Sequence, residues 1–221
     1  MSKNNIVDSL HLDFLQDTNW KPFAIVAGLV VCATAGFYGY RWHAAQGEQA
    51  AQVVFADCMN QLAQAQEGTE PWSSVEQFFK MGYEQHSGSK LAPYFLAYQA
   101  EALIKQNKLA EAVVVMEKAL DTMPKSSPVY GMYATKQALM NIDSNDAALA
   151  QKGLEQLQVL AQDTKNLGQD VALYNLGLYY WSKNDLKKAQ EVWAGFAALQ
   201  KEGKDTSPWA ALAEQKLEYL A

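Results

Sequence analysis

The sequence predicts an all-α protein in which a single N-terminal transmembrane helix precedes an array of paired helices closed by a C-terminal capping helix. Three observations lead to this fold class. An eighteen-residue run without a charged side chain lies near the N-terminus. Beyond it, Ala, Leu, Gln, Glu and Lys dominate, and alternating patterns typical of strands are scarce. Turn-like clusters interrupt this composition at intervals of about 14 to 20 residues, which predicts helical hairpins.

The composition and charge of the 221-residue chain argue against several classes of function. A net charge of −6 and a pI near 5.1 argue against nucleic-acid binding, which rewards clustered Lys and Arg. Cys32 and Cys58 lack metal-ligand spacing, the three histidines are isolated, and no nucleotide-binding, hydrolase or zinc-protease motif occurs. We therefore expect no enzymatic activity, cofactor, metal or small-molecule substrate. An enzyme with an unrecognised site, which would need perturbed ionisable groups in a pocket, is the competing interpretation.

The charge-free run, Phe23–Tyr40, has the length and the boundaries of a membrane span. As a helix it covers roughly 27 Å of a hydrocarbon core that is about 30 Å thick. Aromatic and basic side chains, which favour membrane interfaces, flank it. They are Trp20, Lys21, Tyr38, Tyr40, Arg41 and Trp42. We therefore assign 23–42 as a transmembrane helix.

Three other interpretations of this run are less favoured. A cleaved signal peptide would have a shorter apolar region and a small-residue cleavage site, whereas this run is long and ends in aromatic residues. Lipoprotein processing at Cys32 would need a small residue before the cysteine, where Val31 stands. A buried core helix fits poorly with a charge-free run directly behind a polar N-terminal segment.

The basic residues beside the run predict its orientation. Lys3 and Lys21 lie on its N-terminal side, whereas Arg41 is the only basic residue on the other side before Lys80. This predicts a short cytoplasmic segment at 1–22, a single-pass anchor in the inner membrane, and an outer domain at 43–221. In a Gram-negative bacterium that domain is periplasmic.

Small residues recur at every fourth position of the predicted anchor: Ala24, Gly28, Cys32 and Gly36. This spacing lets a neighbouring helix come close in lipid, where packing rather than hydrophobicity drives association. The stripe is therefore a candidate for helix packing, either with a second copy or with another protein. The alternative is that Gly and Ala are simply common in membrane helices.

Two segments of the outer domain share one pattern of small and large residues. The first comprises Leu96, Ala100, Leu103, Ala112, Met116, Ala119 and Pro124, and the second comprises Leu173, Leu176, Gly177, Tyr180, Ala189, Trp193 and Phe196. The order resembles the tetratricopeptide repeat, in which small residues let paired helices approach and large residues fill the seam. Because the segments are offset by 77 residues, the intervening unit, roughly 127–162, must be irregular or longer. The final stretch, SPWAALAEQKLEYLA, is expected to be a capping helix. Ser207 is its expected N-cap, followed by Pro208 at the first helical position.

The order of parts along the chain resembles the YfgM family, the ancillary subunit of the SecYEG translocon. The resemblance consists of a short N-terminal segment, an anchor ending in GFYGYRW, the helix AAQGEQAAQVVFADCMNQLAQAQ, and degenerate tetratricopeptide units before the capping helix. It implies a periplasmic repeat domain that associates with the translocon and with a PpiD-like chaperone, assisting secreted or envelope proteins. A scaffold in another envelope pathway, such as cytochrome maturation or cell-wall assembly, is the alternative, because repeats alone do not identify a partner.

The leading helix of each predicted pair supplies the candidate binding groove, because leading helices line the concave face of such arrays. The candidates are Tyr94, Glu101 and Lys105 in the first unit and Tyr174, Leu178 and Trp181 in the second, with Ala97 and Val171 on the same faces. An aromatic groove of mixed charge suits extended or helical segments of protein partners. The alternative is that these rings pack against a neighbouring helix or the capping helix.

Three consecutive rings, Tyr179, Tyr180 and Trp181, lie within the second unit. Helical geometry directs them to different neighbours rather than to one site. We expect Tyr180 in the seam of its helical pair, Trp181 on the concave face near Tyr174, and Tyr179 toward the adjoining repeat.

Overall fold

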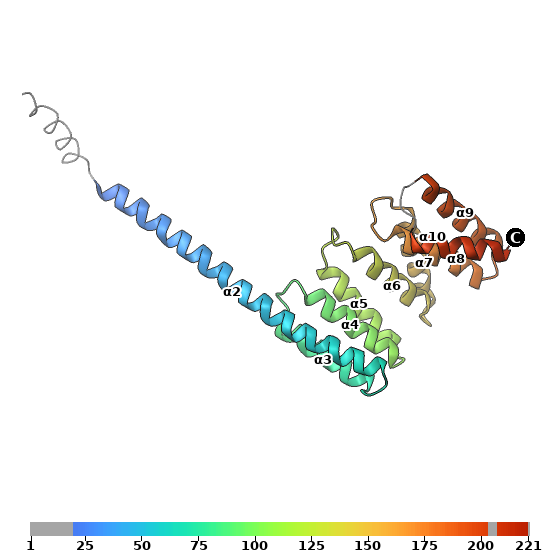
Figure 1. Cartoon of the computed structure of the whole chain (residues 1–221), viewed down its shortest axis with the longest axis horizontal. Helices are drawn as coiled ribbons and strands as arrows, with labels where there is room; N and C mark the ends of the chain where they lie inside the picture. The colour runs from blue at the N-terminus through green and yellow to red at the C-terminus, as the bar shows by residue number, and fades with distance from the viewer. Residues whose placement is uncertain (1–19, 203–206, 221) are drawn as a thin grey trace, which may run out of the picture. The chain divides into compact units, whose positions relative to one another are not determined.

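A computed structural model describes the backbone of residues 20–202 and 207–220 and the side chains of residues 28–196 and 207–219. This part of the chain is helical and contains no strand, which confirms the all-α prediction (Figure 1). The helices are α2 (Trp20–Gln66), α3 (Trp72–Gln85), α4 (Ala92–Lys105), α5 (Leu109–Thr122), α6 (Tyr130–Ile142), α7 (Ala147–Gln162), α8 (Gln169–Ser182), α9 (Leu186–Glu202) and α10 (Pro208–Leu220).

The chain divides into two compact units, and the boundary after Gln49 falls within α2. Of the first unit, the structure describes the helix from Trp20 to Gln49. The second unit contains the remainder of α2, from Ala50, and helices α3 to α10. The hydrophobic clusters of the described side chains all lie in this second unit.

The predicted transmembrane span, 23–42, lies inside α2. Its first five side chains, 23–27, fall outside the described residues. The described remainder of the apolar run, Gly28–Tyr40, is thirteen residues long, whereas a spanning helix needs about 20. No helix in the described part of the chain is long and apolar enough to cross a membrane, so the structure does not confirm the transmembrane helix.

The small-residue stripe of the predicted anchor also lies on α2. Ala24 is outside the described side chains, and Gly28, Cys32 and Gly36 are exposed. A Cβ atom added at Gly28 or Gly36 would meet nothing within 4 Å. Helix packing through this stripe therefore stays a prediction.

Helices of the second unit form successive pairs, in each of which a leading helix is followed by a second helix: α4 with α5, α6 with α7, and α8 with α9. The leading helices α4, α6 and α8 begin 38 and 39 residues apart. Both intervals exceed the usual 34 residues of a tetratricopeptide repeat. The intervening unit of the sequence pattern is the α6/α7 pair, and the additional residues are shared between both intervals.

Two turns within the pairs have the same backbone geometry. Asn107 and Asn184 have positive φ angles of 61° and 59° in the turns after α4 and α8. Asn tolerates the left-handed conformation better than most residues, and it commonly ends a helix there. The α6/α7 pair differs, because the Asp146 carboxylate caps the N-terminus of α7 by accepting from the amides of Ala148 and Leu149 at 2.8 and 3.2 Å.

The last hydrophobic cluster joins α10 to the array. Its fully buried members are Ala189, Trp193, Phe196, Ala210 and Ala213. Helix α10 packs against α8 and α9, the position expected of a capping helix. Ser207 begins this helix as the sequence predicts, with its hydroxyl oxygen accepting from the Trp209 amide at 3.2 Å.

Small residues let the paired helices come close. At Gly177 on α8, an added Cβ atom would overlap the indole of Trp193 on α9. The Trp193 indole is fully buried, and its Nε1–H donates to the Tyr174 carbonyl at 3.1 Å. A glycine at this position therefore lets the largest side chain of the second helix lie directly on the backbone of the leading helix.

We expect Gly177→Ala to lower the free energy of unfolding by about 1–3 kcal/mol, because the methyl group overpacks a seam that cannot relax without moving Trp193. Urea denaturation followed by tryptophan fluorescence measures this change.

Gly195→Ala on α9 is the matched control, since nothing lies within 4 Å of a Cβ atom there. The control should leave stability unchanged or raise it by up to about 1 kcal/mol, because alanine favours helices. Equal stability of the Gly177→Ala chain and the parent would contradict the close-contact explanation.

Candidate protein-interaction surfaces

Two predicted groove residues, Tyr94 and Glu101, connect neighbouring leading helices. The rings of Tyr94 on α4 and Tyr133 on α6 lie edge to face with centroids 6.3 Å apart. The Glu101 carboxylate forms an ion pair with Lys136 of α6. Both side chains are partly buried by these contacts, so they stabilise the junction between repeats.

The third predicted residue of this unit, Lys105, makes a different contact. It lies exposed at the end of α4, and its Nζ atom is 5.8 Å from the centroid of the Trp72 ring. Such an exposed cation–π contact contributes little stability, on the order of 0.5–1 kcal/mol. Lys105 is therefore the member of this set that remains accessible to a partner.

The aromatic candidates of the second unit pack against the end of the array. Tyr174 lies 5.4 Å from the Trp209 ring of α10 and 6.4 Å from Trp193, measured between centroids. Trp181 meets Trp193 edge to face at 6.0 Å, and Lys216 of α10 lies 4.2 Å above the Trp181 ring. Leu178 packs against the same cluster. These contacts match the alternative in which the rings pack against the capping helix, and binding through them stays a prediction.

The three consecutive rings have separate neighbours. The Tyr180 hydroxyl accepts a hydrogen bond from Gln158 Nε2 of α7 at 3.0 Å, and its ring packs on two core clusters. Tyr179 is partly buried, contacts Tyr180, and has the Lys183 ammonium 5.7 Å from its ring centroid. The run is therefore three packing contacts in sequence rather than one aromatic site.

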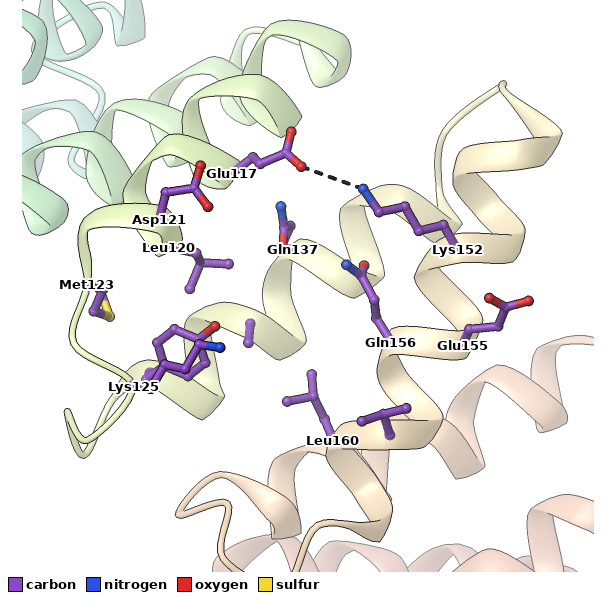
Figure 2. A pocket seen from close by; sticks show the side chains of 13 residues that line it. Glu117, Leu120, Asp121, Met123, Lys125, Gln137, Lys152, Glu155, Gln156 and Leu160 are labelled. Carbon is purple, nitrogen blue, oxygen red and sulfur yellow. Dashed lines mark ion pairs between the residues drawn. The ribbon is translucent and has the colours of Figure 1, made fainter.

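A pocket of about 680 Å³ lies between the second helices α5 and α7, with α6 behind it (Figure 2). Its apolar lining includes Leu120, Met123, Ala134, Val159 and Leu160. Glu117, Asp121, Lys125, Lys152 and Glu155 contribute charged groups, and Tyr130, Gln137 and Gln156 complete the lining. None of the six groove residues predicted from the sequence lines this pocket.

One ion pair bridges the two sides of the pocket. Glu117 of α5 and Lys152 of α7 lie 3.5 Å apart, and about half of each side chain is exposed (Figure 2). Asp121 follows Glu117 by one helical turn and has no ion-pair partner among the described residues. The α5 edge of the pocket therefore carries one neutralised carboxylate and one free carboxylate.

The sequence holds no specific signal for this pocket. Gln137 lies before the small residue Ala138, but Gln99 occupies the same position before Ala100 in α4 and is equally buried. The pocket itself could not be predicted, because it depends on the separation of α5 and α7.

The ionisable groups of the described residues give no sign of a reactive site. Burial, and then the neighbouring Asp57 carboxylate, raises the pKa of the Cys58 thiol to about 11, so this thiol stays protonated near neutral pH. Burial, followed by Tyr98 and Glu101, raises the pKa of Tyr133 above its usual value. No group of three or more metal-ligating side chains occurs in the described part of the chain.

Comparisons with known proteins agree with this geometry. Residues 84–208, more than half of the chain, match the family model described as the CNOT10 tetratricopeptide repeat domain. The chain is also similar to a crystal structure of nearly identical TPR-like repeats from a Podosopora anserina protein named as a kinesin light chain. The TM-score is 0.57 at 14% sequence identity, covering 77% of this chain and 85% of that chain, which shows the fold alone. No curated protein matches the chain.

The paired helices, the small-residue seams and these matches define a tetratricopeptide-like repeat protein. Such repeats typically serve as scaffolds that bind other proteins. The chain belongs to the family of the CNOT10 tetratricopeptide repeat domain. The repeat fold predicted from the sequence is thereby confirmed, whereas membership of the YfgM family stays a prediction.

The Glu117–Lys152 pair is too exposed to hold α5 and α7 together, so we expect Lys152→Gln to change the free energy of unfolding by less than about 1 kcal/mol. Urea denaturation measures the change. Lys165→Gln is the control, because Lys165 is exposed and has no ion pair among the described residues. A decrease of more than about 2 kcal/mol in the free energy of unfolding for Lys152→Gln, but not for Lys165→Gln, would show that the ion pair stabilises the packing of α5 against α7.

Proposed function

We propose that the chain is a non-enzymatic protein-interaction module. The observation that carries this proposal is the stacked array of tetratricopeptide-like helix pairs, which presents many side chains to solvent. Arrays of this kind bind extended or helical segments of other proteins along their helices. The raised pKa of Cys58 and its burial are consistent with a structural rather than a catalytic thiol.

We further propose that the module is anchored in the inner membrane, with residues 1–22 in the cytoplasm and 43–221 in the periplasm. The charge-free run from Phe23 to Tyr40 and its interfacial aromatic residues support this topology. The resemblance to the YfgM family supports a partner at the Sec translocon and a PpiD-like chaperone, with secreted or envelope proteins as clients. The small-residue stripe would then face a neighbouring helix in the membrane.

A topology reporter tests the anchor. Alkaline phosphatase fused after Ala221 should be active, because its disulfides form in the oxidising periplasm. A green fluorescent protein fused there should not fluoresce. The same fusions to a chain without residues 1–42 should show the opposite pattern. An inactive phosphatase and a fluorescent reporter on the full chain would overturn the proposed localisation.

Crosslinking from an exposed leading-helix position tests the partner class. A photoreactive residue in place of Lys105 should give adducts with translocon subunits or a membrane-anchored chaperone. The Lys105 side chain is exposed, and its contact with the Trp72 ring is weak. Mass spectrometry identifies the adducts, and a photoreactive residue at the buried position of Met116 serves as the control. Adducts with cytosolic proteins alone would refute the proposal, whereas subunits of another envelope pathway would favour the alternative scaffold function.

A further inference from the structure

We propose that the pocket between α5 and α7 binds a short peptide segment of a protein partner, in which an apolar side chain stands next to a Lys or Arg. This inference rests on the proposed function as a protein-interaction module, and it identifies a surface other than the leading-helix face. The pocket combines an apolar lining, two glutamine amides that can still bond a ligand, and an acidic edge (Figure 2).

The apolar lining accounts for the apolar side chain of the ligand. Leu120 of α5 and Leu160 of α7 lie on opposite sides of the pocket (Figure 2). Ala134 of α6 also lines it. Val159 is 65% exposed although it lines a concave site. A volume of about 680 Å³ lies in the range of roughly 300–1,000 Å³ typical of ligand sites, so it accommodates a few side chains of a peptide.

The amide groups account for recognition of a peptide backbone. Gln137 is only 8% exposed, and among the described residues its amide has no hydrogen-bond partner. Figure 2 shows the amides of Gln137 and Gln156 directed into the same space. Asn141 Nδ2 donates to Gln156 Oε1 at 3.0 Å, which orients the Gln156 amide and leaves its N–H groups for a ligand. The Gln137 amide atoms still reach solvent at the pocket, so a peptide C=O or N–H would take the place of water there.

The acidic edge accounts for the cation. Glu117 and Asp121 lie beside one another on α5, and only Glu117 is neutralised by Lys152 (Figure 2). Glu155 is held on its own helix, where it accepts from Gln151 Nε2 at 2.9 Å. Lys125 lies apart from the two α5 carboxylates in Figure 2, so it does not cancel the charge of Asp121. A Lys or Arg of the ligand would thus be attracted to Asp121.

Fluorescence anisotropy with three matched octapeptides tests the ligand class on the full chain in detergent. The fluorescein-labelled probe GSLKALKS combines apolar and basic side chains, GSLEALES reverses the charge, and GSSKASKS removes the leucines. We expect saturable binding of the first peptide and at least about tenfold weaker binding of the other two. Equal binding of all three peptides, or binding of none, overturns the proposal.

Three substitutions assign binding to the pocket. Asp121→Lys should weaken binding of GSLKALKS about tenfold, because it reverses the free charge of the α5 edge. Lys152→Gln should tighten binding about threefold, because it frees Glu117 to attract the basic side chain of the peptide. If the ion pair only stabilised the fold, its loss would not raise the affinity. Gln137→Leu should weaken binding about fivefold while the fold persists, because Leu176 occupies the equivalent position in the next unit.

Glu84→Lys on the exposed side of α3 is the matched control for the charge reversal. It should leave the peptide affinity unchanged. Unchanged affinity in Asp121→Lys, or equal losses in Asp121→Lys and Glu84→Lys, refutes the pocket assignment. Crosslinking from Lys105 to envelope proteins together with no peptide binding would retain the proposed function and reject only this inference.

Discussion

Contacts between a small residue on one helix and a neighbouring helix are the interaction on which the array depends. Gly177 lets the Trp193 indole lie on the backbone of α8, and Gly82 on α3 similarly accommodates the Phe95 ring of α4. In an α-solenoid each repeat contacts only the adjacent repeats, so no distant element can compensate for poor packing within one pair. Local close packing therefore determines both stability and the direction in which the chain continues.

The α6/α7 pair departs from its neighbours, and the pocket lies beside this pair. A Cβ atom at Gly153 of α7 would come within 2.5 Å of the Ala138 carbonyl, so these helices meet through their backbones. Gly153 follows Ala138 by fifteen residues, whereas Ala189 follows Gly177 by twelve. Small residues thus let the helices approach in every pair, but in the α6/α7 pair the close contact lies three residues further along the second helix. The pocket between α5 and α7 lies beside this pair.

At the end of the array, aromatic residues of a leading helix contact the capping helix. Tyr174 and Trp181 point toward α9 and α10, where they surround Trp193. The last pair of a solenoid would otherwise expose its hydrophobic face to solvent, and α10 covers that face with Ala210, Ala213 and Trp209. Exposed charged groups also occur at Lys105 and around the pocket.

The sequence by itself determined the helical class, the two repeat segments and the start of the capping helix at Ser207, because helix propensity, small-residue spacing and capping act over a few residues. The tertiary structure decided which side chains remain free. It packed the partly buried rings of Tyr174 and Trp181 against α9 and α10, joined Tyr94 to Tyr133, and left the Gln137 amide without a protein partner in a pocket. These outcomes depend on the separation and rotation of helices that are far apart in the chain, and local periodicity does not encode those quantities.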